Sequence, residues 1–268
     1  MNKTKIEWCD STWNPVTGCL HDCEYCYARK IANRFGMEFA PLQGEFEGIV
    51  YDPSISNDDI MYELDKPVMS NERIQPYPAG FMPTFHKYRL DEPTRKIKGQ
   101  NIFVCSMADL FGDWVPDEWV RDVFTACHKA PQHNYLFLTK NPKRYKQFEY
   151  NYFSNMWFGI SYTHLIDGII PGAREFLKIN KQNLFMSLEP ILEPLHFGIV
   201  REYIKWAIVG AETGNRKGKV IPKKEWIQDI VEECKYAGIP VFMKNSLIPI
   251  MGEENMLREF PEGLRRNA

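Results

Sequence analysis

The sequence lacks a long hydrophobic run. No apolar stretch in its 268 residues approaches the roughly 20 residues that a membrane helix needs. The opening Met-Asn-Lys-Thr-Lys is not followed by the hydrophobic segment of a secretion signal. We therefore expect a cytoplasmic protein, whose reducing surroundings keep its cysteine thiols free.

The sequence also lacks an excess of either charge. It has 33 Lys and Arg against 35 Asp and Glu, a net charge of −2, so any nucleic-acid partner would have to meet a local basic patch. Seven cysteines, an odd number, do not suit a disulfide framework. Without internal repeats or a clear boundary, residues 1–268 are expected to form a single domain, and about 250 residues suit a barrel.

Three of the seven cysteines lie within eight residues, in Gly18-Cys-Leu-His-Asp-Cys-Glu-Tyr-Cys-Tyr-Ala28. Thiolates are the ligands that iron–sulfur clusters prefer, and Cys19, Cys23 and Cys26 can hold three irons of a cubane cluster. Three ligands for four irons leave one iron open to bind a small molecule. The alternative is a structural zinc site with His21 as the fourth ligand, but no second Cys/His pair at zinc spacing follows.

The remaining cysteines carry less information. Cys127 and Cys234 continue apolar stripes at helical spacing, which is typical of small core residues. Cys9 has no pattern of its own. Cys105 lies at the end of an apolar run and is considered below.

Short apolar runs alternate with amphipathic helical patterns from residue 100 onward. Their density of Val, Ile, Phe and Trp indicates strands buried on both faces, as in a parallel sheet. The runs are Asn101–Met107, Tyr135–Lys140, Met156–Tyr162, Asn183–Pro190, Lys205–Glu212 and Pro240–Asn245. With Thr12–Val16 and Pro83–Tyr88 we expect about eight strands, and we predict an α/β fold: a full or partial (β/α) barrel.

The sequence also indicates where helices begin and end. Pro116 and Pro222 suit first helical positions, and Gly238 suits the terminating one. A helix over Tyr27–Phe35 would follow the cysteine loop. Gly36–Met82, rich in Gly, Pro, Asp and Glu, is expected to be an insertion, either a lid or a long surface loop.

Polar residues close nearly every apolar run. In a barrel the carboxyl ends of the strands meet at one mouth, where catalytic groups gather. The residues concerned are Ser106, Asp109, Thr139, Lys140, Ser161, Ser187, Glu189, Glu212 and Lys244.

Several longer stretches resemble one known family. They lie within Ile6–Cys19, Phe103–Phe111, Leu138–Pro142, Ser187–Pro190 and Val209–Gly214. Together they resemble a radical-SAM-like family of unknown activity that is frequent in phage and bacterial genomes. The resemblance runs from about Lys5 to Phe242 and skips most of the insertion. A more distant similarity is to spore photoproduct lyases, radical SAM enzymes that repair a thymine dimer.

The resemblance implies a radical SAM enzyme. A [4Fe–4S] cluster on the three cysteines would cleave S-adenosylmethionine (SAM) reductively, and the product radical would take hydrogen from a substrate. An external electron donor is then required. The resemblance and the strand ends together suggest further site residues: Tyr25 beside the cluster and adenine; Ser106, Asp109, Lys140 and Ser161 on SAM; Glu189 and Glu212 on SAM hydroxyls or substrate, or as strand-end caps.

The role of Cys105 and the substrate stay open at this point. Cys105 is either a hydrogen donor, as in the lyases, or an inert buried thiol. Basic residues gather after two strands, at Lys140, Lys143, Arg144 and Lys146 and at Arg216, Lys217, Lys219, Lys223 and Lys224. They suit a nucleotide or nucleic-acid substrate, or are solvated surface. The alternative function is a non-catalytic iron–sulfur or zinc protein that binds nucleic acid or a protein partner.

Overall fold

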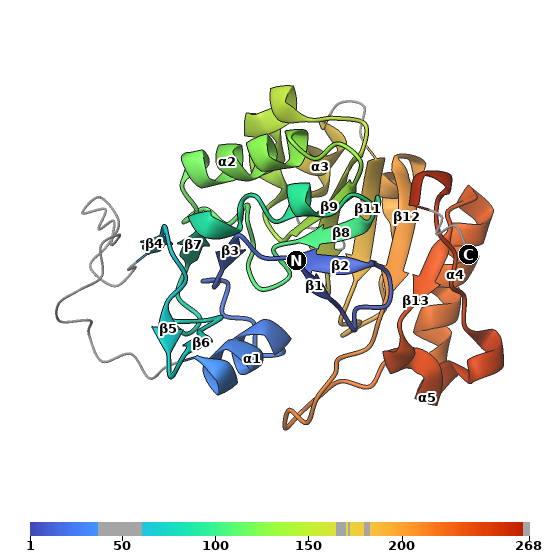
Figure 1. The fold of residues 1–268 in the computed structure, drawn as a ribbon. Coiled ribbons are helices and arrows are strands. Elements are labelled where there is room, and N and C mark those ends of the chain that lie inside the picture. Colours follow the sequence, from blue (N-terminus) through green and yellow to red (C-terminus); the bar gives the residue numbers. More distant parts are fainter. Residues whose placement is uncertain (37–60, 165–169, 171, 180–182, 265–268) are drawn as a thin grey trace.

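A curled, mostly parallel sheet forms the centre of the molecule (Figure 1). The computed structural model describes residues 1–36, 61–164, 170, 172–179 and 183–264. The sheet has the strand order β1-β2-β8-β9-β10-β11-β12-β13, in which β1 pairs antiparallel with β2 and the other pairings are parallel. The strands are β1 Asn2–Lys3, β2 Ser11–Trp13, β8 Asn101–Val104, β9 Asn134–Thr139, β10 Met156–Tyr162, β11 Asn183–Leu188, β12 Ile204–Val209 and β13 Val241–Met243.

The sheet is a half-barrel of seven parallel strands. Within the described ranges no pairing joins β13 back to β1 or β2, so the predicted α/β barrel is confirmed in its partial form. The prediction that Pro83–Tyr88 is a barrel strand is wrong. Strand β7 (Thr84–His86) instead lies between β3 (Val16–Thr17) and β4 (Tyr62–Leu64) in a small second sheet, because its backbone pairs with the turn that leads into the cysteine loop.

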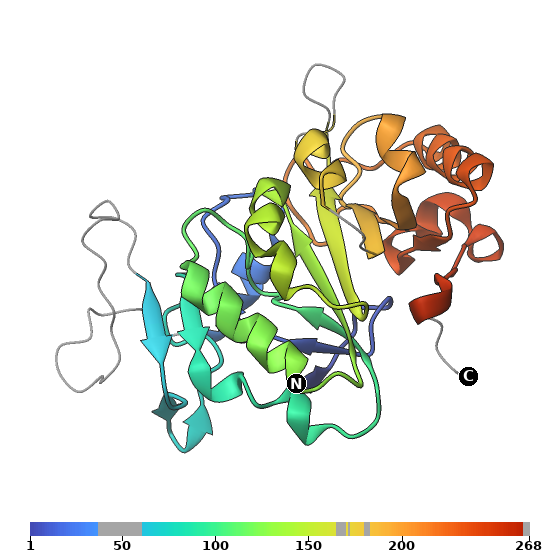
Figure 2. The ribbon, with the colours of Figure 1, turned by 90° about the horizontal axis from the view of Figure 1, so that it is seen from above.

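The helices follow the predicted boundaries closely. The helix α1 spans Tyr27–Phe35 as expected. The prolines expected inside the other helices lie just outside them, and Gly238 ends α4 with a left-handed φ of 68°. The other helices are α2 Asp117–His128, α3 Ala173–Leu177, α4 Lys224–Ala237 and α5 Ile248–Met251. Figures 1 and 2 show α2, α3 and α4 on the outer side of the curled sheet.

The insertion is described only in its second half, since residues 37–60 lie outside the described ranges. Residues 61–82 form β4 and a hairpin of β5 (Met69–Ser70) and β6 (Arg73–Ile74). The backbone N–H of Cys19 donates to the Phe81 carbonyl at 3.2 Å. This part of the insertion is therefore a wall of the cysteine loop.

The sheet is packed on both faces with a period of two. One side chain points outward against the helices and the next points into the half-barrel. The inner layer is largely aromatic and consists of Trp8, Phe103, Leu136, Trp157, Phe185, Trp206, Ile208, Phe242 and Leu264, among others. Gly159 lacks a side chain because a Cβ there would overlap the Phe185 ring. The inside is thus a packed core rather than a pore.

Two further expectations concern burial and helix length. Cys127 and Cys234 lie in the outer core, as predicted, and Cys9 is buried beside the inner layer. In the described ranges, none of the helices has the length and apolar character required to cross a membrane.

Candidate functional site at the carboxyl ends of the strands

The alternation of the core continues into a polar rim. On β9, β10 and β11 the inward residues Leu136, Trp157 and Phe185 are each followed, four positions later, by a polar side chain. Residues at this interval lie on the same face of a strand. Lys140, Ser161 and Glu189 therefore extend the inner face beyond the aromatic core, at the mouth that the sequence predicted.

The cysteine loop joins β3 to α1. Its first residue, Gly18, has a φ of 87°, and a Cβ there would overlap the Met82 carbonyl, so glycine is required. The Gly18 N–H donates to the Met107 carbonyl at 2.9 Å. Cys26 caps the start of α1, where its Sγ accepts the Arg29 N–H at 3.3 Å. The loop is thus fixed at both ends.

The three thiols fit an iron–sulfur cluster by their chemistry. Cys19, Cys23 and Cys26 are all free and partly exposed, and an N–H donated to sulfur, as at Cys26, stabilises thiolate character. Burial raises the pKa of Cys19 to about 12, so this thiol requires a bound cation to ionise at neutral pH. Within the described ranges, no three His, Cys, Asp or Glu side chains are already arranged around a metal position.

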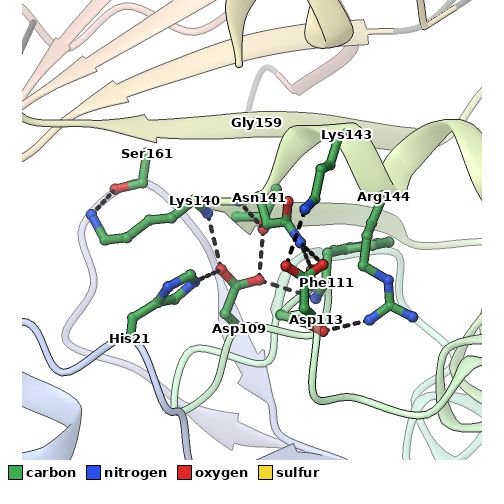
Figure 3. Close-up of polar contacts among 12 residues, drawn as sticks. His21, Asp109, Phe111, Asp113, Lys140, Asn141, Lys143, Arg144, Gly159 and Ser161 are labelled. Atoms are coloured by element: carbon green, nitrogen blue, oxygen red, sulfur yellow. Dashed lines mark hydrogen bonds and ion pairs between the residues drawn. The ribbon is translucent and has the colours of Figure 1, made fainter. Parts of the chain in front are cut away.

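Asp109 ties the cysteine loop to the sheet (Figure 3). Its buried carboxylate accepts from the Thr139 hydroxyl at 2.7 Å, the Phe111 N–H at 3.0 Å and the Lys140 N–H at 2.9 Å. The same group contacts Nε2 of His21 at 2.8 Å. Four partners occupy both oxygens, so Asp109 holds three chain segments together. Its role as a SAM ligand stays a prediction, and the protein contacts show how the carboxylate is held in place. His21, the fourth zinc ligand of the alternative interpretation, is bonded to this carboxylate.

Lys140 points into the mouth toward the cysteine loop. Its Nζ lies 3.4 Å from the Ser161 Oγ (Figure 3). The same Nζ lies 3.1 Å from the Tyr25 hydroxyl. The Tyr25 hydroxyl in turn lies 3.4 Å from the Thr163 Oγ1. No carboxylate in the described ranges forms an ion pair with Lys140. The structure thus brings together three of the predicted residues, one from the loop and two from strand ends. Within the described ranges the Lys140 ammonium has hydroxyl groups as hydrogen-bond partners and lies 5.4 Å from the centre of the Tyr25 ring.

The predicted carboxylates are engaged with cations. Glu189 forms an ion pair with Lys244 across the mouth. Glu212 is buried and receives two hydrogen bonds from Arg216, at 2.7 and 2.8 Å, which hold the pKa of its carboxyl below the usual value. Arg216 also reaches Glu24 at 3.1 Å. Arg216 therefore links the segment after β12 to the cysteine loop by ion pairs.

Cys105 does not continue the alternation of β8, in which Phe103 belongs to the inner layer and Val104 to the outer core. Cys105 has a left-handed φ of 56°, which breaks the period of the strand and places its side chain in the outer core, 3% exposed. Burial raises its pKa to about 12. The Ser106 hydroxyl donates to Asn14 Oδ1 at 3.1 Å. These contacts favour the inert interpretation of Cys105.

The first basic cluster is largely used within the protein. Lys143 pairs with Asp113, and the buried Arg144 pairs with Asp117 and donates to the Val115 carbonyl. Arg144 is therefore held inside the protein, whereas Lys143 and Lys146 are exposed. In the second cluster, Lys217, Lys223 and Lys224 are exposed.

Sequence reasoning missed several contributors to the site. Asn14 accepts from both the Ser106 hydroxyl and the Met107 N–H, each at 3.1 Å. Thr163 and Glu24 were not predicted. Asn14 lies inside a stretch that was already recognised, whereas the partners of Thr163 and Glu24 are distant in sequence and gave no signal.

Comparison with known proteins identifies a family. Residues 3–247 match the family described as "Protein of unknown function (DUF5131)". The chain belongs to this family. No curated protein matches it.

Solved structures of spore photoproduct lyase share a distant likeness with this family member. The lyase complexed with dinucleoside spore photoproduct has 12% identity and a TM-score of 0.43, over 90% of this chain and 57% of the lyase chain. A mutant lyase has 10% identity and a TM-score of 0.48, over 90% and 78%. The family member thus spans little more than half of the first lyase structure, and a likeness at this level concerns the fold alone.

Proposed function

We propose that the chain is a radical SAM enzyme in which Cys19, Cys23 and Cys26 hold a [4Fe–4S] cluster. The observation that supports this most is the approach of the cysteine loop to the strand ends, where Tyr25, Lys140 and Ser161 meet. A metal loop with a purely structural role has no need of an ammonium without a carboxylate partner beside it. The cluster and SAM, when bound, would supply a radical that removes a hydrogen atom from the substrate.

The residues of the mouth have distinct roles in this proposal. Lys140 binds the carboxylate of SAM, and Ser161 and Tyr25 hold the ammonium in place before SAM arrives. One hydrogen bond to a charged group contributes about 1.5–3 kcal/mol. Asp109 fixes the backbone of Lys140 and the ring of His21, so the loop and the SAM-binding side chain keep a constant separation. The aromatic layer below excludes water.

The substrate in this proposal is a nucleotide or nucleic acid. Its support is the group of exposed lysines after β12, near the Arg216–Glu24 ion pair that joins this segment to the cysteine loop. Phosphate groups are attracted to such a patch even though the chain as a whole carries a net charge of −2.

Anaerobic reconstitution with iron and sulfide tests the cluster. Replacing Cys19, Cys23 or Cys26 by Ala should abolish the brown, oxygen-sensitive chromophore, and Cys127→Ala, a buried cysteine outside the loop, is the control that should keep it. A triple variant with the iron content of the wild type would refute the assignment. Zinc in place of iron in the purified protein would favour the structural alternative.

Catalysis is tested with reconstituted protein, SAM and a reductant. Release of 5′-deoxyadenosine is expected, and its absence from a protein with a full, reducible cluster would refute the enzymatic proposal. Labelled single-stranded oligonucleotides test the substrate class. A Lys217→Glu/Lys224→Glu variant should bind them more weakly than wild type, with a smaller dependence on salt.

A further inference from the structure

One face of the helix α1 borders the mouth of the half-barrel. The Tyr27 hydroxyl donates to the Ser106 carbonyl at 2.7 Å, just after the end of β8. Burial of this hydroxyl and the nearby Glu189 carboxylate raise the pKa of Tyr27. About one turn further along, the Lys30 ammonium lies 3.8 Å from the position that a Cβ at Gly214 would take, in the segment after β12. The helix therefore lies between the end of β8 and the segment after β12.

The exposed side chains of this face are aromatic, aliphatic and basic. Tyr27, Lys30, Ile31 and Arg34 follow each other at intervals of three or four residues, which places them on one side of the helix. The hydrogen bond of the Tyr27 hydroxyl holds its ring in place, while the residue stays 44% exposed. The helix contains no carboxylate, and within the described ranges neither Lys30 nor Arg34 forms an ion pair.

The segment after β12 carries charge of the same sign. Between Glu212 and Glu225 the sequence has five basic residues and no carboxylate. Among them, Lys217, Lys223 and Lys224 are exposed. Figure 1 shows this segment and α1 at the same end of the sheet. Two basic segments without carboxylates therefore flank the mouth, in a chain whose net charge is −2.

We propose that a single-stranded nucleic acid lies between α1 and the segment after β12, with a base stacked on Tyr27 and phosphates on Lys30 and Arg34. This inference rests on the proposed function and narrows its substrate class. Aromatic side chains stack on the faces of bases, which a duplex covers with its own stacking, so an exposed ring favours a single strand. Cations on both sides of the mouth suit a chain of phosphates, whereas a mononucleotide carries its phosphates at one place.

Fluorescence anisotropy with the reconstituted protein tests the stacking. The probe is a labelled oligothymidylate of about 12 nucleotides, within the usual site sizes for single strands. Wild type should bind it about tenfold more tightly than the duplex of the same length. Tyr27→Leu, which removes the ring, should weaken binding about tenfold. Tyr27→Phe keeps the ring without the hydrogen bond to Ser106, and should stay within about threefold of wild type.

Removal of charge tests the phosphate contacts. Lys30→Gln/Arg34→Gln should weaken binding of the oligothymidylate. It should also reduce the slope of the logarithm of the binding constant against that of the salt concentration by about 1.4, because each phosphate contact to a single strand accounts for about 0.7. The matched control is Lys96→Gln/Lys98→Gln, two exposed lysines before the opposite end of β8. This control should leave the slope unchanged and the affinity within about twofold of wild type.

Photochemical cross-linking locates the strand. When one thymidine is replaced by 5-iododeoxyuridine, irradiation links that base to an aromatic ring stacked on it, and mass spectrometry should find the link at Tyr27. An oligouridylate of the same length compares RNA with DNA, and tighter binding of either single strand than of its duplex supports the proposal. A link only to aromatic residues far from the mouth, such as Phe153, would contradict it.

Three further results would overturn the proposal. They are no binding by the wild type, equal affinity for single strand and duplex, and unchanged affinity and salt dependence in the α1 variants. The first of these would leave the face to a protein partner. Failure of the underlying function looks different: the protein then has a full, reducible cluster but releases no 5′-deoxyadenosine from SAM, whether or not the oligothymidylate binds.

Discussion

Replacement of Asp109 by Asn is the sharpest test of how the site is held together. The amide has the shape of the carboxylate, and its oxygen can keep the hydrogen bonds from Thr139 and Phe111. The new NH₂ group then faces the Lys140 N–H and His21. The His21 ring is partly exposed and can turn or change tautomer, but the backbone N–H of Lys140 loses its acceptor.

The expected loss in free energy of unfolding follows from these contacts. A buried N–H without an acceptor costs about 1–3 kcal/mol, and the change from a charged to a neutral acceptor adds roughly 1 kcal/mol for the bonds that remain. We expect Asp109→Asn to lower the free energy of unfolding by about 2–4 kcal/mol. Asp109→Ala, which removes every acceptor, should cost more.

Urea unfolding of the cluster-free protein, with extrapolation to water, measures the loss. The control is Asp113→Asn in the same loop, whose carboxylate is 66% exposed and bonds to Asn141 and Lys143. It should cost less than about 1 kcal/mol, because exposed pairs contribute little. Equal losses in the two variants would show that Asp109 does not tie the segments together.

Three further predictions concern other parts of the site. Lys140→Ala should weaken SAM binding about tenfold in equilibrium titration and leave the cluster spectrum intact, since each tenfold step corresponds to about 1.4 kcal/mol; unchanged affinity would refute its role. In urea unfolding, Gly18→Ala should lower the free energy of unfolding by several kcal/mol. Gly238→Ala, also at positive φ but with open space around it, should lower it by roughly 1 kcal/mol. Arg216 lowers the folded-state pKa of Glu212, so this stabilisation is complete above the ordinary value of 4.5 and is lost as the pH falls through the lowered pKa. A Glu212→Gln variant should therefore show a flatter loss of stability in acid, and an unchanged acid limb would contradict the pairing.

The sequence was sufficient to predict strands and helices wherever the pattern that marks them is local. The strand Met156–Tyr162 and the helix Tyr27–Phe35 were predicted with the bounds that the structure has, because side-chain periodicity and burial act over a few neighbouring residues. The position of Lys140 and Ser161 at the ends of apolar runs predicted that they would share the mouth. Gly238 was recognised as a helix end because the left-handed conformation there suits glycine.

Long-range pairing was decided by the tertiary structure alone. The apolar run at Pro83–Tyr88 looks like any barrel strand, but its hydrogen bonds go to Val16 and Thr17, and sequence does not encode such partners locally. Likewise the left-handed φ of Cys105 interrupts the strand alternation, so the structure alone decided that its side chain lies in the outer core.

The tertiary structure likewise decided which partners each charged side chain has. The sequence does not show that Asp109 accepts from the Lys140 backbone or that Arg144 pairs with Asp117, because these partners are about 30 residues away in the chain. The cysteine spacing determined the kind of metal chemistry to expect, since three thiolates need only a short loop. Which side of that loop faces the strand ends depended on contacts between residues as far apart as Tyr25 and Lys140, because only folding brings such groups within hydrogen-bonding distance.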